Sequence, residues 1–474
     1  MKQKWYVTCA IPYVNASPHQ GHALEFIQGD VIARYHRLLG EDVILLSGAD
    51  ENALKNIQAA EAADMDVQTF VDQNAKFFQE MAKKINVQFD VFQKGSDKIH
   101  HYPSSQKLWQ LCDKAGDIYN KSYTGLYCLG CEVFYTPDEL DANGECFEHP
   151  GKKLEEVKEE NYFFRLSKYQ NRLTQLIEED KYQIIPASKK NEALSFIKSG
   201  LQDISISRTN ERTKNWGVPV PNDPTQRIYV WMDALNIYQS GVGFGWNDEM
   251  YNKWWPADLH IIGRGILRFH AVYWPAFLLS AGLSLPKKLF VHDYITINDQ
   301  KMSKTLGNII DPLDVVKKYG ADALRYYLLA KVSPFSDGDY SDSKMLEAYN
   351  ADLANGLGNL IARVTKLCEQ NNIEATPRSN VWCADLEKYM GEFKFNEAIA
   401  VIWQLIAEVD KKINQEKPWE LSGEELKKIL SDYVKRIQAI AFNLQPFLPE
   451  TAEKILKQFS GKIKSAPILF PRLR

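Results

Sequence analysis

Hydrophobic and polar residues follow two different periodic patterns along this chain, a strand–helix alternation first and a continuous helical period later. In the first part, an apolar run at residues 5–10 predicts a buried strand. Apolar positions at helical spacing over 21–39 predict a helix, and 43–46 predict a second strand. This strand–helix–strand order favours an α/β fold with a doubly wound parallel sheet, in which ligands bind at the carboxyl ends of the strands.

The strand pattern breaks off and then resumes. Residues 118–160 are rich in Gly, Cys, Asp and Glu with little helical period, which is typical of an inserted module. Short apolar runs at 228–231, 259–263 and 289–292 predict that the sheet continues. We therefore expect a split Rossmann-type domain (1–115 and 215–290) interrupted by a connective insertion (116–214).

From Ser343 onward the period is helical without interruption. Apolar residues recur every three or four positions after Leu346, and further helical runs cover 395–413 and 426–444. We expect an all-α bundle over 346–474, joined to the first part by a segment over 291–345 that contains a lysine-rich loop.

Composition narrows the class of protein. The chain has 474 residues, 45% hydrophobic and 25% charged, as in soluble globular proteins of several domains. A net charge of −4 means that any nucleic acid would be bound through local patches. No apolar run is long enough to span a bilayer, so we expect no membrane partner. The start of the chain lacks a signal or transit pattern, and we expect a cytoplasmic protein.

Two short polar motifs have the residues for binding phosphate. His19 and His22 flank Gly21 where the first strand meets the first helix, and a helix N-terminus attracts anions. Lys301 and Lys304 lie in the lysine-rich loop. Taken alone, each motif also fits surface histidines beside a turn glycine or a solvated loop.

A third motif lies in the insertion. Cys128, Cys131, Cys146 and His149 have the spacing C-x2-C…C-x2-H. Four such ligands in two turns suit tetrahedral Zn²⁺, and a site with four protein ligands is structural rather than catalytic. The alternative is a disulfide, but nothing in the chain indicates an oxidising compartment.

Together and in this order, the two polar motifs resemble the HIGH and KMSKS signatures of class I aminoacyl-tRNA synthetases, with Thr305 in place of the final Ser. The whole chain is most similar to the methionyl-tRNA synthetases of bacterial type. Residues 8–15 resemble that family's first strand and turn, residues 230–234 its third sheet segment, and residues 268–276 its methionine-pocket helix. Gly265 and Asn52 depart from the family, which usually has Asp and His there.

The resemblance implies roles for particular residues. It implies that Arg208 lies near the reacting groups and that Asp50 takes the substrate ammonium. Binding of ATP, with Mg²⁺, would involve His19, Gly21, His22, Lys301, Ser303 and Lys304. The methionine pocket would be lined by Ile11, Tyr13, Trp231, Ala234, Tyr238, Phe269, His270 and Trp274, although such aromatics also commonly fill cores.

The helical part resembles the family's anticodon-binding domain. Asn359 and Arg363 are one turn apart on a helix, and Trp419 follows a later helix. Unpaired bases are recognised by stacking and by hydrogen bonds to base edges. A surface polar pair and a tryptophan packed on the core would have the same pattern.

The resemblance therefore predicts ATP-dependent aminoacylation of tRNA(Met), including the initiator, with L-methionine through methionyl-adenylate. The chain ends where the family's core ends, so we expect a monomer. The rival predictions are another class I synthetase such as the cysteinyl enzyme, an RNA-binding paralogue without activity, and a nucleotidylyltransferase. The cysteinyl enzyme would require zinc ligands that face the amino-acid pocket, whereas here they lie in a separate insertion. The two histidines and two lysines of the polar motifs argue against an inactive paralogue, and a nucleotidylyltransferase would have no use for the helical domain.

Overall fold

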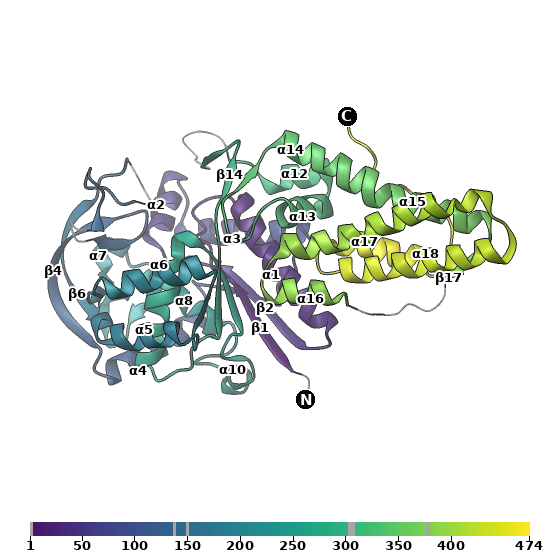
Figure 1. Cartoon of the computed structure of the whole chain (residues 1–474). Helices are drawn as coiled ribbons and strands as arrows, with labels where there is room; N and C mark the ends of the chain where they lie inside the picture. The colour runs from purple at the N-terminus through teal and green to yellow at the C-terminus, as the bar shows by residue number, and fades with distance from the viewer. Residues whose placement is uncertain (1–2, 136–138, 148–150, 302–308, 376–379, 381) are drawn as a thin grey trace. The chain divides into compact units, whose positions relative to one another are not determined.

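A computed structural model describes residues 3–135, 139–147, 151–301, 309–375, 380 and 382–474 (Figure 1). The chain forms two units. The first comprises Met1–Pro18, Gly40–Glu80 and Phe89–His292, and the second comprises His19–Leu39, Met81–Gln88 and Asp293–Arg474.

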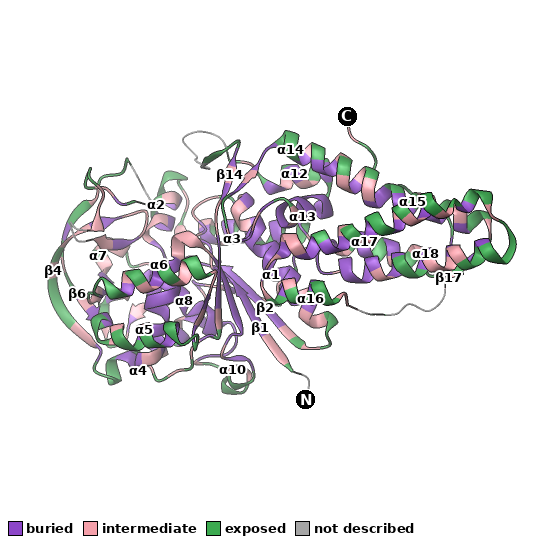
Figure 2. Ribbon diagram, in the orientation of Figure 1, coloured by how far each residue is buried: buried purple, intermediate pink, exposed green. Residues whose placement is uncertain are grey.

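A six-stranded parallel sheet forms the centre of the first unit. Its order is β3 (Val91–Lys94), β2 (Asp42–Ala49), β1 (Lys4–Cys9), β12 (Leu259–Gly263), β13 (Lys288–His292) and β7 (Gln183–Ile185). The middle strands are buried on both faces (Figure 2), as expected when helices cover a parallel sheet. The predicted doubly wound α/β fold is confirmed, and β7 adds an edge strand that the sequence pattern does not indicate.

One strand prediction is wrong. Residues 228–231 do not continue the large sheet: Ile228 ends β11 (Asp223–Ile228), which pairs with β9 (Ser207–Thr209) and β10 (Pro219–Val220) in a separate sheet. Helix α8 (Val230–Leu235) begins immediately afterwards, and all six of its residues are buried. Periodicity cannot distinguish a short, fully buried helix from a buried strand.

The predicted insertion contains an antiparallel sheet. Its order is β5 (Val133–Tyr135), β4 (Ile118–Cys128), β6 (Glu155–Phe164) and β8 (Ile204–Ser205). Helices α5 (Gln170–Glu178) and α6 (Ala187–Lys198) lie side by side (Figure 1). The other helices of four or more residues in this unit include α2 (Leu54–Ala62), α4 (His101–Lys114), α7 (Asn210–Thr213), α9 (Ile237–Ser240), α10 (Asp248–Trp254) and α11 (Trp274–Ser280).

The second unit is mainly helical. Helix α1 (Gln20–Leu38) belongs to it, α3 (Val67–Lys84) bridges the boundary in sequence, and β14 (Ile295–Ile297) pairs with β15 (Gln300–Lys301) and β16 (Gly338–Tyr340). The C-terminal region is helical, as predicted, with α15, α17 and α18 side by side (Figure 1). Three helices of this unit begin before residue 346: α12 (Pro312–Tyr319), α13 (Ala321–Ala330) and α14 (Asp342–Ala348). The helices that follow are the π-helical η5 (Tyr349–Gly358), α15 (Asn359–Gln370), α16 (Ala384–Gly391), α17 (Phe395–Glu416), α18 (Gly423–Leu444) and α19 (Pro449–Gln458).

Within the part of the chain that the structure describes, we find no helix with the length and apolar character needed to cross a bilayer.

Gly48 on β2 allows two strands of the large sheet to pair. A Cβ atom at this position would lie 2.1 Å from the backbone oxygen of Gln93 on β3. Because a backbone atom cannot move aside cheaply, we expect Gly48→Ala to destabilise the protein by about 1–3 kcal/mol. Differential scanning calorimetry should show a lower Tm.

Gly391→Ala is the matched control, because the described residues leave open space around a Cβ at the end of α16. It should leave the Tm unchanged or slightly raised. Equal Tm values for the two variants would contradict the packing described for Gly48.

Candidate functional site

The predicted apolar pocket residues come together in the first unit. Trp231 stacks on Phe269 with ring centroids 3.6 Å apart and planes at 3°, and Tyr13 meets Trp231 edge-on at 6.0 Å. Ile11 and Ala234 belong to the same apolar cluster. The rings come from α8, from the helical turn at 269–273 and from the segment after β1, so three distant pieces of chain form one aromatic wall.

A buried polar pair completes this wall. His270 Nδ1 lies 3.0 Å from the carbonyl oxygen of Ile266, so it carries the proton and donates it. Nε2 is then the acceptor for the Tyr238 hydroxyl at 2.8 Å. Burial lowers the pKa of His270 to about 4, so the imidazole is neutral at neutral pH. The pair therefore presents a fixed dipole rather than a charge.

A second buried histidine, His260, packs against the Tyr238 ring with ring centroids 4.3 Å apart, and the sequence analysis missed it. His260 on β12 accepts from the Trp274 indole N–H at 3.3 Å and contacts Thr8 Oγ1 through Nδ1 at 2.6 Å. Burial lowers the pKa of His260 well below its usual value, and nearby His270 lowers it further. The signal available in the sequence was a histidine within an otherwise apolar strand.

Asp50 follows β2 directly, at the carboxyl end of the sheet. Its N–H donates to the carbonyl oxygen of Pro12 at 2.9 Å, and it bridges to Tyr13 in parallel register. Burial raises the pKa of the Asp50 carboxyl well above its usual range, and the neighbouring Glu132 and Asp233 raise it further.

Two polar atoms here have no hydrogen-bond partner among the described residues. They are Oδ1 of Asp50 and the hydroxyl of Tyr13, and both are buried. Unpaired buried polar atoms are uncommon and costly. A ligand bringing a cationic N–H group into the aromatic pocket would satisfy the carboxylate and offset its burial.

Three cysteines of the predicted metal motif cluster beside this pocket. The Sγ atoms of Cys128, Cys131 and Cys146 lie within 4.8 Å of one another, and those of Cys131 and Cys146 are 3.3 Å apart. The fourth predicted ligand, His149, lies outside the described residues. Three soft thiolate donors at this separation fit Zn²⁺.

The turn that carries these cysteines also contacts the pocket. The Trp231 indole N–H donates to the carbonyl oxygen of Cys131 at 3.2 Å. The Lys55 ammonium donates to Gly130 O at 2.9 Å and lies 3.3 Å from the centre of the Tyr13 ring. Lys55 and the buried Glu132, which accepts from the Lys55 N–H at 3.2 Å, were missed because only tertiary contact relates them to the pocket.

The predicted phosphate-binding histidines lie at the start of α1, in the second unit. His19 is the N-cap and its Nδ1 accepts from the N–H of Gly21 at 3.1 Å, while His22 Nδ1 accepts from the N–H of His19 at 3.2 Å. The two rings stack at 3.9 Å. Both Nδ1 atoms are therefore engaged in the cap of α1.

The second polar motif is only partly described. Lys301 ends β15, paired in backbone register with Thr296. Ser303 and Lys304 lie outside the described residues.

Arg208 lies on β9 and is buried. Its Nη1 donates to the carbonyl oxygens of Ser205 and Ser207 at 3.3 and 2.7 Å, and its guanidinium lies 4.5 Å from the Tyr229 ring. Its Nε has no partner among the described residues. The structure thus places this cation among aromatic rings of the first unit.

The predicted anticodon residues lie in the bundle of the second unit. Asn359 begins α15, and Arg363 on the same helix pairs with Asp410 at 2.5 Å and donates to Asn414 Oδ1 at 3.0 Å. Trp419 is 58% exposed, which is unusual for so large an apolar ring. Its exposure removes the alternative that it is a core residue.

Comparisons with known proteins agree in one family. Residues 5–365 match the sequence model of the family "tRNA synthetases class I (M)". The chain is 41% identical to the methionine–tRNA ligase of Thermotoga maritima, over 97% of this chain and 76% of that protein. It is 39% identical to the corresponding ligase of Brucella suis, over 96% of this chain and 91% of that protein.

Solved structures give the same result. The methionyl-tRNA synthetase of Mycobacterium tuberculosis in complex with methionyl-adenylate superposes with a TM-score of 0.91 at 35% identity, covering 99% of this chain and all of that one. The apo form of the same enzyme gives 0.85 at 34% identity, covering 100% and 99%.

The cysteine cluster predicts a measurable metal content. The purified protein should contain about one zinc ion per chain by inductively coupled plasma mass spectrometry, and Cys146→Ala should lose it. The control is Cys383→Ala, since Cys383 lies in the other unit and outside the cluster. Metal retained by Cys146→Ala, or absent from the wild type in zinc-replete medium, would contradict a metal site.

Proposed function

Since the chain belongs to the class I methionyl-tRNA synthetases, we propose that it joins L-methionine to tRNA(Met), the initiator included. The reaction uses ATP, passes through methionyl-adenylate and releases AMP and pyrophosphate. The observation that carries the proposal is an aromatic pocket next to a buried carboxylate with an unpaired oxygen.

The pocket residues suit both the side chain and the ammonium group of methionine. A thioether is polarizable and is attracted to the edges of aromatic rings such as Tyr13, Trp231 and Phe269. The ammonium group pairs with Asp50 in a charge-assisted hydrogen bond. One methylene in an apolar pocket is worth only about 1–3 kcal/mol, so the fixed Tyr238–His270 dipole supplies further discrimination at the sulfur.

The first chemical step forms a bond between the methionine carboxylate and the α-phosphorus of ATP, while the bond to the pyrophosphate oxygen breaks. No proton needs to move, so catalysis consists of positioning and of stabilising negative charge. His19 and His22, with the N-terminal amides of α1, hold the α-phosphate side, and Gly21 permits close approach. Lys301, Ser303 and Lys304 hold the β- and γ-phosphates, which Mg²⁺ accompanies. Arg208 acts near the reacting groups.

In the second step the terminal adenosine hydroxyl of the tRNA attacks the methionyl carbonyl and AMP leaves. We assign recognition of the anticodon to the helical part at 346–474, through Asn359, Arg363 and stacking on Trp419. The insertion at 116–214 interrupts the Rossmann-type domain at 1–115 and 215–290, and residues 291–345 carry the lysine loop.

The proposal includes a structural Zn²⁺ held by Cys128, Cys131, Cys146 and His149. When bound, the ion fixes the turn whose carbonyl groups hold Trp231 and Lys55. We also propose that the chain acts as a monomer in the cytoplasm, and multi-angle light scattering tests the oligomeric state.

Asp50→Asn tests the pocket. The substitution keeps the size of the side chain but removes its charge, so the KM for methionine in ATP–pyrophosphate exchange should rise about 10- to 100-fold. Because burial raises the pKa of Asp50, its ionised form costs stability at neutral pH. The variant should therefore keep or raise the Tm, which separates this effect from misfolding.

Asp248→Asn is the control, since the Asp248 side chain is 79% exposed in the same unit. It should leave the KM unchanged. An unchanged KM in Asp50→Asn as well would remove Asp50 from the ammonium site.

Trp419→Ala tests the anticodon assignment. Stacking of a base is worth about 1–3 kcal/mol, so the Kd for tRNA(Met) should rise roughly 5- to 100-fold. Phe77→Ala, at another partly exposed ring in the first unit, serves as control. With a tRNA whose anticodon has been replaced, wild type and Trp419→Ala should bind equally; an equal loss with both tRNAs would place the ring elsewhere on the complex.

A further inference from the structure

One fully buried arginine connects four segments of the second unit. Arg325, in the middle of α13, is 0% exposed. Its Nε donates to the carbonyl oxygen of Phe447 at 2.7 Å, and its Nη2 donates to that of Pro446 at 2.9 Å. Its Nη1 donates to the carbonyl oxygens of Ile85 and Asn86 at 3.2 and 3.3 Å. Backbone from the α18–α19 turn and from the segment after α3 thus converges on one guanidinium.

The anion that faces this guanidinium belongs to α1. Nη2 of Arg325 lies 2.8 Å from Oδ2 of Asp30, and the Asp30 side chain is also 0% exposed. Asp30 accepts in addition from Arg34 Nε at 2.6 Å and from the N–H of Gln88 at 3.1 Å. We call Asp30, Arg34 and Arg325 the Arg325 node.

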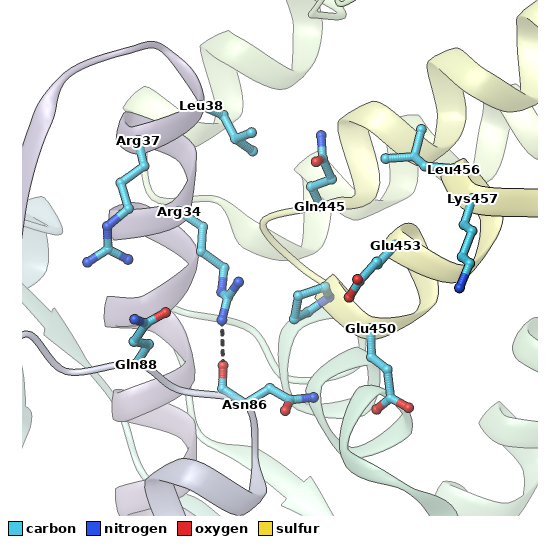
Figure 3. A pocket seen from close by; sticks show the side chains of 11 residues that line it. Arg34, Arg37, Leu38, Asn86, Gln88, Gln445, Glu450, Glu453, Leu456 and Lys457 are labelled. Carbon is cyan, nitrogen blue, oxygen red and sulfur yellow. Dashed lines mark hydrogen bonds between the residues drawn. The ribbon is translucent and has the colours of Figure 1, made fainter. Parts of the chain in front are cut away.

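The rim of the node is visible beside an open cleft of about 890 Å³ (Figure 3). Arg34 points from α1 towards Asn86, to whose carbonyl oxygen it donates at 2.8 Å, the dashed line in Figure 3. Glu450 and Glu453 come from α19 across the cleft. Neither Arg325 nor Asp30 lines this cleft, and both side chains are 0% exposed, so this ion pair is buried rather than a surface bridge.

Thermodynamic stability alone does not explain such an arrangement. Removing two charges from water is costly, and apolar replacements of buried ion pairs are often neutral or stabilising. The node fixes the orientation of the segments that it joins. A planar guanidinium has five N–H donors in fixed positions, so each acceptor around it must lie in a defined direction. Lysine could neutralise Asp30 but could not reach carbonyl oxygens on several segments.

The segments that the node joins bear on the proposed reaction. Helix α1 begins at the His19 and His22 cap, and Asp30 is eleven positions after His19 in the sequence, roughly 16 Å along a rigid helix. Helix α13 follows α12, the first helix after the lysine loop. One turn before Arg325, Asp322 accepts from the N–H of Thr451 on α19 at 2.6 Å, so α13 holds the bundle at two points.

We propose that Arg325 is a positioning residue for phosphate chemistry: through Asp30 it fixes α1, and with it His19 and His22, in register with α13 and the α18–α19 turn. The inference rests on the proposed function, since it assigns the phosphate contacts to the start of α1. Loosening the node should slow adenylate formation while leaving methionine binding intact. A misplacement of about 1 Å at a reacting centre is enough to cost about 100-fold in rate.

The decisive variant is Asp30→Asn, which removes the charge while Arg325 keeps its carbonyl acceptors. We expect kcat of methionine-dependent ATP–pyrophosphate exchange to fall about 10- to 100-fold. The KM for methionine, and the Kd from an equilibrium titration with methionine followed by intrinsic tryptophan fluorescence, should stay within about 2-fold of wild type. Assays run about 20 °C below the measured Tm exclude unfolding as the cause.

Arg325→Lys separates orientation from charge. If the node only neutralises Asp30, lysine restores kcat and the inference is overturned; if orientation matters, kcat stays low. Should Arg325→Lys fail to fold, Asp30→Asn decides alone. Glu453→Gln is the control, because Glu453 is an exposed residue of the same cleft outside the node, and its kcat should equal that of wild type.

The outcomes are distinguishable. If Asp30→Asn folds and its kcat equals that of wild type, the inference is overturned, whether or not its Tm is lower. The proposed function is then unaffected. A wild-type protein without methionine-dependent exchange overturns the proposed function, and the inference falls with it.

Discussion

A carboxylate buried at the end of a parallel strand is the constraint on which the first unit depends. Asp50 sits where β2 leaves the sheet, with its backbone bonded to Pro12 and its Oδ1 unpaired among the described residues. Keeping a charge there is unfavourable, as the raised pKa of Asp50 indicates. The proposed function accounts for this cost: in it the aromatic wall encloses the apolar side chain of methionine and the carboxylate pairs with its ammonium group.

Hydrogen bonds from other segments of the first unit fix the orientation of the pocket side chains. His270 is neutral and fixed in one tautomer by Ile266, Tyr238 is fixed by His270, and Trp231 is held by the cysteine turn. Each contact joins segments that are distant in the sequence. A metal ion in the cysteine cluster would therefore act on the pocket through backbone carbonyl groups without touching the substrate.

Much of this could be predicted from the sequence, since strong local signals identify it. The apolar runs located β1, β12 and β13, and the helical period located the bundle. The cysteine motif at Cys128 was recognisable from its spacing, and the motif at His19 from its combination with the later lysine motif. The run at 228–231 misled because a six-residue buried helix and a buried strand have the same composition.

Other features could not be predicted, because only the fold creates them. Nothing near Lys55 in the sequence indicates that its ammonium lies over Tyr13, and nothing near Arg325 indicates that Asp30 is its partner. Such long-range polar contacts depend on the packing of whole elements. They are also the contacts that give the pocket of the first unit and the Arg325 node of the second unit their defined geometry.

The account's central claim is that this pocket selects one amino acid for activation by ATP. Its most direct test is the exchange of labelled pyrophosphate into ATP, with each of the twenty amino acids supplied singly to the wild-type protein. The account predicts exchange with methionine alone. Exchange supported by a different amino acid would contradict the pocket assignment, and no exchange with any would contradict activation itself.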